Sequence, residues 1–237
     1  MKNPAPFILN KKMATKKKSV VLLSGGLDSA VTLFFAKNRG YECYCLNFDY
    51  GQRHRIEMKM AAKIARAAGA DLRTVKIGMP WGGSSLLDKK LNLPLRRHPA
   101  VIKRSGVPST YVPARNTIFL SIAASYAEAI GADAIFIGAH SEDSSGYPDC
   151  RKEYIEAFDR VIRIGTKRGI ENRLKLISPL IKMPKKKIVE LGQRLKVPFK
   201  YTWSCYKGGA KPCGECDSCV LRARGFKEAG IDDTTER

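Results

Sequence analysis

One short loop constrains the fold of this chain more than any other feature. The run Ser24-Gly-Gly-Leu-Asp-Ser29 follows an apolar, β-branched segment over 19–23 and precedes a helical pattern over 28–37. Such a short apolar run is typical of a buried parallel strand. A glycine pair there permits close backbone approach to a ligand, and the N–H groups at the start of the helix favour an anion. The segment therefore predicts a phosphate-binding loop at the carboxyl end of a strand.

This loop differs from the G-x-x-x-x-G-K-[ST] phosphate loop because no lysine follows its glycines. Without that lysine, the loop suits a pyrophosphate unit that leaves intact rather than transfer of the γ-phosphate. We expect Asp28 to hold magnesium or water near the α-phosphate, and Ser24 and Ser29 to add hydroxyl donors. The alternative is a plain glycine turn with a capped helix, which is common in proteins. The position directly after a buried strand favours the phosphate loop.

The remaining chain alternates between strand and helix patterns. Strands are expected over 19–23, 41–49, 72–77, 132–137 and 174–178, and helices over 28–37, 56–68, 116–130, 151–167, 184–195 and 220–229. This order predicts an α/β fold with a doubly wound parallel sheet. Residues 79–110 break the pattern with four prolines and three glycines. Since long loops in compact domains are usually functional, we expect a lid or a substrate loop there.

A group of four cysteines lies near the end of the chain, at Cys205, Cys213, Cys216 and Cys219. Four thiolates satisfy a tetrahedral zinc ion and leave no open position, so we expect one structural Zn²⁺ per chain. An iron–sulfur cluster is the competing interpretation. Visible absorbance of the purified protein would favour iron, and its absence would favour zinc.

The charge of the chain is strongly positive, with a formal net charge of +21. Residues 1–18 contain six lysines and no acid, and we interpret them as a disordered basic tail. Further basic groups over 163–175 and at Lys185–Lys187 suggest a polyanion surface, so weak RNA binding is a further expectation. A well-solvated surface is the simpler explanation. We divide the chain into the tail 1–18, a catalytic α/β domain 19–197 and a metal-binding segment 198–237.

The composition also bears on the compartment. No apolar run approaches the roughly 20 residues that a membrane span needs, and the apolar stretch 7–9 is too short for a signal peptide. Seven cysteines without an export signal favour a reducing compartment. We therefore expect a cytoplasmic protein with no membrane partner.

Three polar segments follow strands or precede helices at the edge where ligands bind in such sheets, over 49–54, 113–116 and 138–151. The motifs in and around them, together with the phosphate loop and the cysteines, resemble the 7-cyano-7-deazaguanine synthase family of the PP-loop ATP pyrophosphatase superfamily. The resemblance extends from about Ser19 to Gly230. It is carried by Asn47-Phe-Asp-Tyr-Gly-Gln-Arg-His54, Tyr111-Val-Pro-Ala-Arg-Asn-Thr117, Ser145-Gly-Tyr-Pro-Asp-Cys-Arg151 and Thr202-Trp-Ser-Cys-Tyr206.

The resemblance implies an adenine nucleotide alpha hydrolase-like, Rossmann-like fold and an ATP-dependent carbon–nitrogen ligase. Members convert 7-carboxy-7-deazaguanine and ammonia to the nitrile in two rounds of adenylation, releasing AMP and pyrophosphate, on the route to queuosine and archaeosine in tRNA. Magnesium is expected with ATP, and a homodimer is a further expectation.

The resemblance also implies roles for particular residues. Asp28 and Arg115 are the expected catalytic residues, with Arg115 at the α-phosphate. The substrate is expected at Asp49, Gln52, His54, Asp149 and Arg151. ATP is expected at Leu23, Ser24, Gly25, Gly26, Leu27, Asp28, Ser29, Ala30, Val31, Thr32 and Leu33.

Two other functions stay open on the sequence. The first is a PP-loop enzyme that acts directly on tRNA, by thiolation or lysidine formation, and the net charge supports it. The second is a non-catalytic nucleic-acid binder with a zinc site, which would not need the phosphate loop. Free ammonium is the simpler nitrogen source, because no glutaminase-like cysteine–histidine pair is evident.

Overall fold

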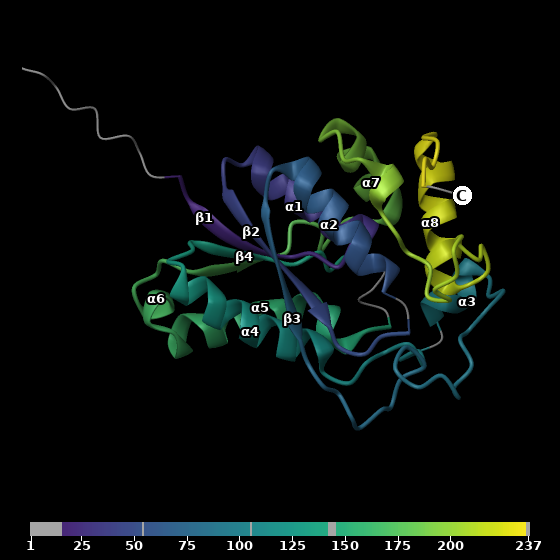
Figure 1. Ribbon diagram of the computed structural model, residues 1–237, viewed down its shortest axis with the longest axis horizontal. Helices are drawn as coiled ribbons and strands as arrows, with labels where there is room; N and C mark the ends of the chain where they lie inside the picture. The colour runs from purple at the N-terminus through teal and green to yellow at the C-terminus, as the bar shows by residue number, and fades with distance from the viewer. Residues whose placement is uncertain (1–15, 54, 105, 142–145, 236–237) are drawn as a thin grey trace, which may run out of the picture.

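The computed structural model describes residues 16–53, 55–104, 106–141 and 146–235. A sheet of five parallel strands in the order β3-β2-β1-β4-β5 forms its centre (Figure 1). The strands are β1 (Lys18–Leu22), β2 (Glu42–Asp49), β3 (Asp71–Lys76), β4 (Ala134–Phe136) and β5 (Lys175–Ile177). The strand order reverses between β1 and β4, and ligands bind at such a switch point in open α/β sheets.

Helices cover both faces of this sheet, as Figure 1 shows. One face packs against α4 (Arg115–Ala129) and α5 (Lys152–Gly165), with a core that includes Leu120 and Ile162. The other face packs against α1 (Leu27–Asn38), α2 (Ile56–Ala68) and α7 (Lys185–Arg194). Because two separate cores sandwich the sheet, the predicted doubly wound α/β class is confirmed.

The shorter elements connect these layers. They are α3 (Pro99–Arg104), η2 (Pro148–Cys150), α6 (Lys167–Ile170) and η3 (Phe199–Tyr201), and the chain closes with α8 (Asp217–Ala229). No helix in the described ranges combines the length and the hydropathy needed to cross a bilayer.

Most predicted boundaries differ from the observed ones by one or two residues, and three differences change the course of the chain. The segment 79–110 is not loop throughout, because it contains α3. The helix expected over 151–167 ends at Gly165, where Thr166 accepts a hydrogen bond from the Gly169 N–H and starts α6. The last helix begins at Asp217 rather than at 220, since Cys216 is its N-cap and two of the cysteines thus flank its first turn.

The two ends of the described chain are anchored to the α/β layers. Lys18, assigned to the tail, belongs to β1, and its N–H donates to Asp133 Oδ2 at 2.9 Å. The rest of the tail up to residue 15 lies outside the described residues. At the other end, Phe226 of α8 belongs to the core with α1 and α7. The proposed division at 197 and 198 stays a prediction.

Candidate active site

The glycine loop is a pre-organised turn at the carboxyl end of β1. The Leu23 N–H donates to Leu46 O at 2.8 Å, which fixes the end of the strand. Ser24 Oγ lies 3.0 Å from Ser29 Oγ and accepts the Gly26 N–H at 3.2 Å. Gly25 has φ +94°, and a Cβ there would lie 2.2 Å from Glu57 O, so only glycine fits. The backbone is therefore set for anion binding before any ligand arrives.

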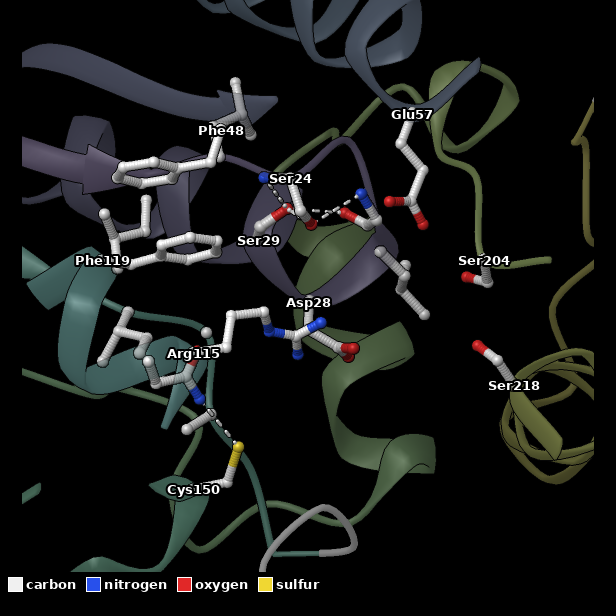
Figure 2. Close-up of a pocket in the computed structure, with 18 of the residues that line it drawn as sticks. Ser24, Asp28, Ser29, Phe48, Glu57, Arg115, Phe119, Cys150, Ser204 and Ser218 are labelled. Carbon is white, nitrogen blue, oxygen red and sulfur yellow. Dashed lines mark hydrogen bonds between the residues drawn. The ribbon is translucent and has the colours of Figure 1, made fainter. Parts of the chain in front are cut away.

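A cavity of about 250 Å³ opens at this loop (Figure 2). Its volume lies just below the roughly 300–1,000 Å³ common for small-molecule sites. The end of β2, the start of α4 and the cysteine-rich segment form its other walls. These walls include Asn47, Phe48, Tyr50, Gln52, Glu57, Arg115, Asn116, Phe119, Trp203, Ser204, Ser218 and Arg222.

The phosphate loop receives a lysine from a distant helix. Lys185, at the start of α7, is buried, and its Nζ donates to Asp28 Oδ1 and Oδ2 at 2.9 and 3.0 Å. The same Nζ lies 2.9 Å from His140 Nε2. Burial alone would raise the pKa of Asp28, but Lys185 and His140 hold it below its ordinary value. Asp28 is therefore an anion, with a lysine ammonium beside the loop.

This contact corrects the interpretation of Lys185–Lys187 as a polyanion surface. Only Lys186 and Lys187 are exposed there, and both lie within ion-pair distance of Glu190 on the same helix. Lys185 points inward because Gly225 of α8 packs closely on it, where a Cβ would lie 2.4 Å from Lys185 Cγ. The sequence shows three adjacent lysines but not which one the fold buries.

Arg115 and a pair of aromatic rings shape the side of the cavity near α4. Arg115 Nη1 donates to Tyr50 Oη at 3.2 Å, which directs the guanidinium to the cavity wall. Phe48 and Phe119 stack with their ring centroids 3.9 Å apart and their planes within 3° of parallel. This wall therefore combines a cation with flat apolar surface, which suits an anionic, planar ligand.

The predicted ATP residues divide into two groups. Six line the cavity: Leu23, Ser24, Gly26, Leu27, Asp28 and Ser29. Gly25 shapes the turn without lining it. Ala30, Val31 and Leu33 are wholly buried in the core between α1, α2 and α7, and Thr32 is buried as well. The second half of the predicted stretch thus supports the loop from beneath.

The predicted substrate residues are spread more widely. Gln52 lines the cavity, and its Nε2 donates to Phe48 O at 3.1 Å. Asp49 lies away from the wall, with its Oδ2 at 3.7 Å from Arg55 Nη2. Arg151 is exposed and is not part of the wall either. His54 lies outside the described residues.

Asp149 has a structural position. It is 5% exposed, and its Oδ2 accepts the Asn116 N–H at 2.9 Å while its carbonyl accepts Asn116 Nδ2 at 3.1 Å. The carboxylate thus caps the first turn of α4, where free N–H groups favour an anion. Arg115 begins that turn and lines the cavity. Asp149 therefore positions Arg115 through α4 and does not itself line the cavity.

Several wall residues could not be found from sequence patterns. Glu57 and Asn47 are single polar residues within an ordinary helix and strand pattern. His140 lies in the polar segment 138–151, but nothing in that segment's sequence indicates that His140 contacts Lys185. Only the spatial arrangement of strands and helices brings these groups together.

The four cysteines meet as predicted. Their Sγ atoms all lie within 4.8 Å of one another. Backbone N–H groups point at the sulfurs, from Cys213 to Cys205 Sγ at 3.3 Å and from Cys216 to Cys213 Sγ at 3.4 Å. A cluster of four sulfurs with N–H donors around them fits a tetrahedral metal site. These residues would hold the metal that ties Cys205 to the start of α8.

The fold and the site define the chain as an α/β nucleotide-binding protein of the PP-loop type, with a cysteine cluster beside its cavity. The family model described as "Queuosine biosynthesis protein QueC" matches residues 18–230. The chain therefore belongs to the QueC family of queuosine biosynthesis proteins.

Two of the similar proteins share one name. A 7-cyano-7-deazaguanine synthase from Thermoplasma volcanium is 50% identical over 217 residues, covering 92% of this chain and 89% of that protein. One from Trichormus variabilis is 50% identical over 225 residues, covering 91% and 96%. Since the relatives are named synthases and the family match is nearly complete, the chain is an enzyme of that family.

Two solved structures of similar fold have much lower sequence identity. The NMN synthetase of Francisella tularensis has a TM-score of 0.49 at 15% identity, covering 92% of this chain and 79% of that one. A 4-thiouridine synthetase in complex with RNA and ATP has a TM-score of 0.45 at 22% identity, covering 90% and 50%.

Proposed function

We propose that this enzyme is an ATP-dependent carbon–nitrogen ligase that converts 7-carboxy-7-deazaguanine and ammonia to 7-cyano-7-deazaguanine. The observation that carries the proposal is the pre-organised loop with Asp28 and Lys185 beside it, at a cavity that Arg115 also lines. The identity of the substrate that is adenylated, 7-carboxy-7-deazaguanine, is inferred from family membership. The loop would bind the phosphates of ATP, and the cavity would bind the deazaguanine.

The chemistry explains why a pyrophosphate-holding loop is needed. A carboxylate oxygen does not leave readily, so adenylation replaces it with AMP as the leaving group. Ammonia then displaces AMP and gives the amide. A second adenylation, on the amide oxygen, allows that oxygen to leave as AMP and the nitrile to form. One loop serves both rounds.

The residues at the loop take the following roles in this proposal. Lys185 and Arg115 stabilise the negative charge that builds up on the phosphates as pyrophosphate leaves. Asp28 would hold the magnesium that accompanies ATP, since carboxylate oxygen is a preferred ligand. Lys185 donates to both Asp28 oxygens, so its ammonium group lies beside the loop that would hold the phosphates.

The other residues predicted to bind the substrate or the metal have unequal support. Gln52 lies on the cavity wall, so it is the best placed to contact the deazaguanine. Asp49, the last residue of β2, and Arg151, the N-cap of α5, do not line the cavity and would have to turn their side chains toward it to touch the substrate. The four cysteines would bind a structural zinc ion, which supplies folding free energy and takes no part in the reaction.

Pyrophosphate exchange tests this proposal. The wild-type enzyme should exchange labelled pyrophosphate into ATP only when 7-carboxy-7-deazaguanine is present. Asp28→Ala should abolish that exchange and leave the metal content unchanged. Normal turnover in Asp28→Ala would remove Asp28 from the ATP site.

A tRNA-modifying activity is the second candidate, and the net charge of +21 is the observation that favours it. In that case tRNA rather than the deazaguanine should support the exchange. Binding to tRNA would then weaken steeply with salt, because each phosphate contact releases counterions.

A further inference from the structure

The cavity wall contains a carboxylate that the roles above leave unused. Glu57 lies in the first turn of α2, and Figure 2 shows its side chain reaching into the cavity, apart from Asp28 and Arg115. Within the described part of the chain, its carboxylate makes no hydrogen bond and no ion pair. Asp28, by contrast, is paired with Lys185. Glu57 is therefore a carboxylate on the cavity wall with no cation of the described residues within ion-pair distance, although Arg115 acts on it from further away.

A second acceptor lines the same cavity. Asn47 is 3% exposed, and its Nδ2 donates to Leu23 O at 2.7 Å, which fixes the amide orientation. Its Oδ1 is buried and accepts no hydrogen bond from any described residue. A buried acceptor without a donor costs free energy unless a ligand supplies one. The cavity is thus lined by two residues with an acceptor that no described donor satisfies, Asn47 on β2 and Glu57 on α2.

The charge of the ligand follows from these groups. Phosphates and a substrate carboxylate are anions, which a bare carboxylate repels and which Arg115 and Lys185 attract. A small cation with several N–H donors fits Glu57 and Asn47 instead. Ammonium is the one co-substrate of the proposed reaction with that chemistry. Glu57 and Asn47 would therefore bind ammonium, while Arg115 and Lys185 would bind the phosphates.

We propose that Glu57 binds the ammonium ion, with Asn47 as a second acceptor, and takes up the protons that its nitrogen loses in both rounds. This proposal rests on the proposed function. In the first round, Glu57 accepts one proton as ammonium becomes ammonia. The nitrogen lone pair then forms the C–N bond, the C–O bond to AMP breaks with its electrons on AMP, and a second N–H proton leaves.

The second round uses the same base. After the amide oxygen is adenylated, its C–O bond breaks with the electrons on AMP, and the two remaining N–H protons leave as the C≡N bond forms. The nitrogen that enters with four hydrogens leaves with none. Glu57 returns each proton to solvent, so no oxidant or other co-reactant is needed.

The electrostatics of the site support a base at this position. Burial raises the pKa of Glu57 to about 8, against a lowering by Arg115 and with a smaller raise from Cys205. With a pKa of about 8, Glu57 is partly protonated near neutral pH, and a bound ammonium ion would favour its charged, proton-accepting form.

The test compares Glu57→Gln with Glu153→Gln, a matched change at an exposed glutamate of α5. Loss of a general base typically costs about 10²–10⁴-fold. We expect kcat/KM for ammonium chloride to fall about 100-fold or more in Glu57→Gln. Pyrophosphate exchange without ammonium should fall far less, and Glu153→Gln should behave as wild type in both assays.

Hydroxylamine provides an independent readout. It is mostly unprotonated at neutral pH, so it needs no base to become a nucleophile. We expect the deficit of Glu57→Gln, relative to wild type, to shrink strongly when hydroxylamine replaces ammonium and the hydroxamate is measured. Thermal unfolding and metal content check that Glu57→Gln is folded. If it is not, Glu57→Asp is used in its place, because it keeps the carboxylate but moves it away from the ammonium.

Three outcomes separate the alternatives. Unchanged ammonium kinetics in Glu57→Gln would overturn the proposal. An equal loss in exchange and nitrile formation, with a changed dependence on magnesium, would overturn it by assigning Glu57 to ATP and its metal. Absence of deazaguanine-dependent exchange in the wild type would instead refute the proposed function.

Discussion

The phosphate loop and the cysteine cluster differ in how much of the chain each requires. All four cysteines lie between Cys205 and Cys219, and backbone donors from the same segment surround the sulfurs. The backbone of the loop at 24–29 is fixed by contacts among neighbouring residues. The lysine that pairs with its Asp28 is Lys185, which lies 157 residues further along the chain. A cysteine cluster that fits a metal can thus be complete within one short segment, whereas the cavity at the glycine loop is assembled from several elements.

The two regions are nevertheless joined. The Trp203 N–H donates to Gly25 O at 2.9 Å, and Trp203 and Ser204 line the cavity just before the first cysteine. Ser218 lies in the first turn of α8 and lines it as well. The cysteine segment is therefore one wall of the cavity, and damage to the cluster should reach the nucleotide site.

The largest effect is expected from breaking the cluster. Cys213→Ser should lose zinc, and structural zinc contributes on the order of 10 kcal/mol in zinc-finger peptides. An ordinary point substitution costs about 1 kcal/mol. Thermal unfolding and metal analysis would measure the loss, and ATP binding should weaken because the wall at Trp203 and Ser204 loosens. A metal-free but fully stable and active variant would contradict the structural role.

The lysine from α7 tests whether the loop can act alone. Lys185→Ala should lower kcat/KM about 10²–10³-fold, as loss of a preorganised electrostatic group typically does. Lys186→Ala is the matched control, because Lys186 is exposed and belongs to the same run of lysines. Steady-state kinetics with ATP would measure both. Equal activity of the two variants would mean that the loop needs no cation from α7.

The two glycines of the loop give a narrower test. Gly25→Ala should cost about 1–3 kcal/mol in backbone strain at positive φ, and more because the new Cβ overlaps Glu57 O. A Cβ at Gly26 would lie 3.3 Å from Ser24 Oγ, and this residue does not have positive φ, so Gly26→Ala should be milder. Chemical denaturation would compare them, and a reversed order would contradict the loop geometry.

The smallest effect is expected at an ion pair near the end of the chain, whose contribution to stability depends on pH. Arg222 donates to both oxygens of Asp233, at 2.7 and 3.0 Å. Burial raises the pKa of Asp233, but Arg222 and Thr235 hold it below the ordinary value. Its contribution to stability is therefore present above the ordinary pKa near ~3.9 and is lost as pH falls through the lower folded-state pKa.

Asp233→Asn should therefore cost about 2 kcal/mol near neutral pH, the scale of a hydrogen bond to a charged group, and lessen the loss of stability on acidification. Asp232→Asn, at an exposed neighbouring residue, serves as the control. Urea unfolding at neutral pH and near pH 3 would measure the difference. Identical pH dependence in wild type and Asp233→Asn would exclude a contribution from this ion pair.

Much of the fold followed from local patterns because strand and helix periodicities are local properties. The helix over 56–68 was predicted with both of its ends, since Gly69 closes it in the left-handed conformation. The start of α8 was missed because the pattern of turns around the cysteines gave no sign of the helix beginning at Asp217. Boundaries fixed by tertiary contacts are not visible in such patterns.

The sequence by itself determined the turn of the glycine loop, the grouping of the four cysteines and the doubly wound class, because glycine conformation, cysteine spacing and hydrophobic periodicity each act over a few neighbouring residues. Tertiary structure decided which lysine of 185–187 reaches Asp28, which half of 23–33 faces the cavity, and that Glu57 enters it while Asp149 caps α4. These depend on how helices distant in sequence pack on one sheet, and the burial that packing creates sets the charge of each group.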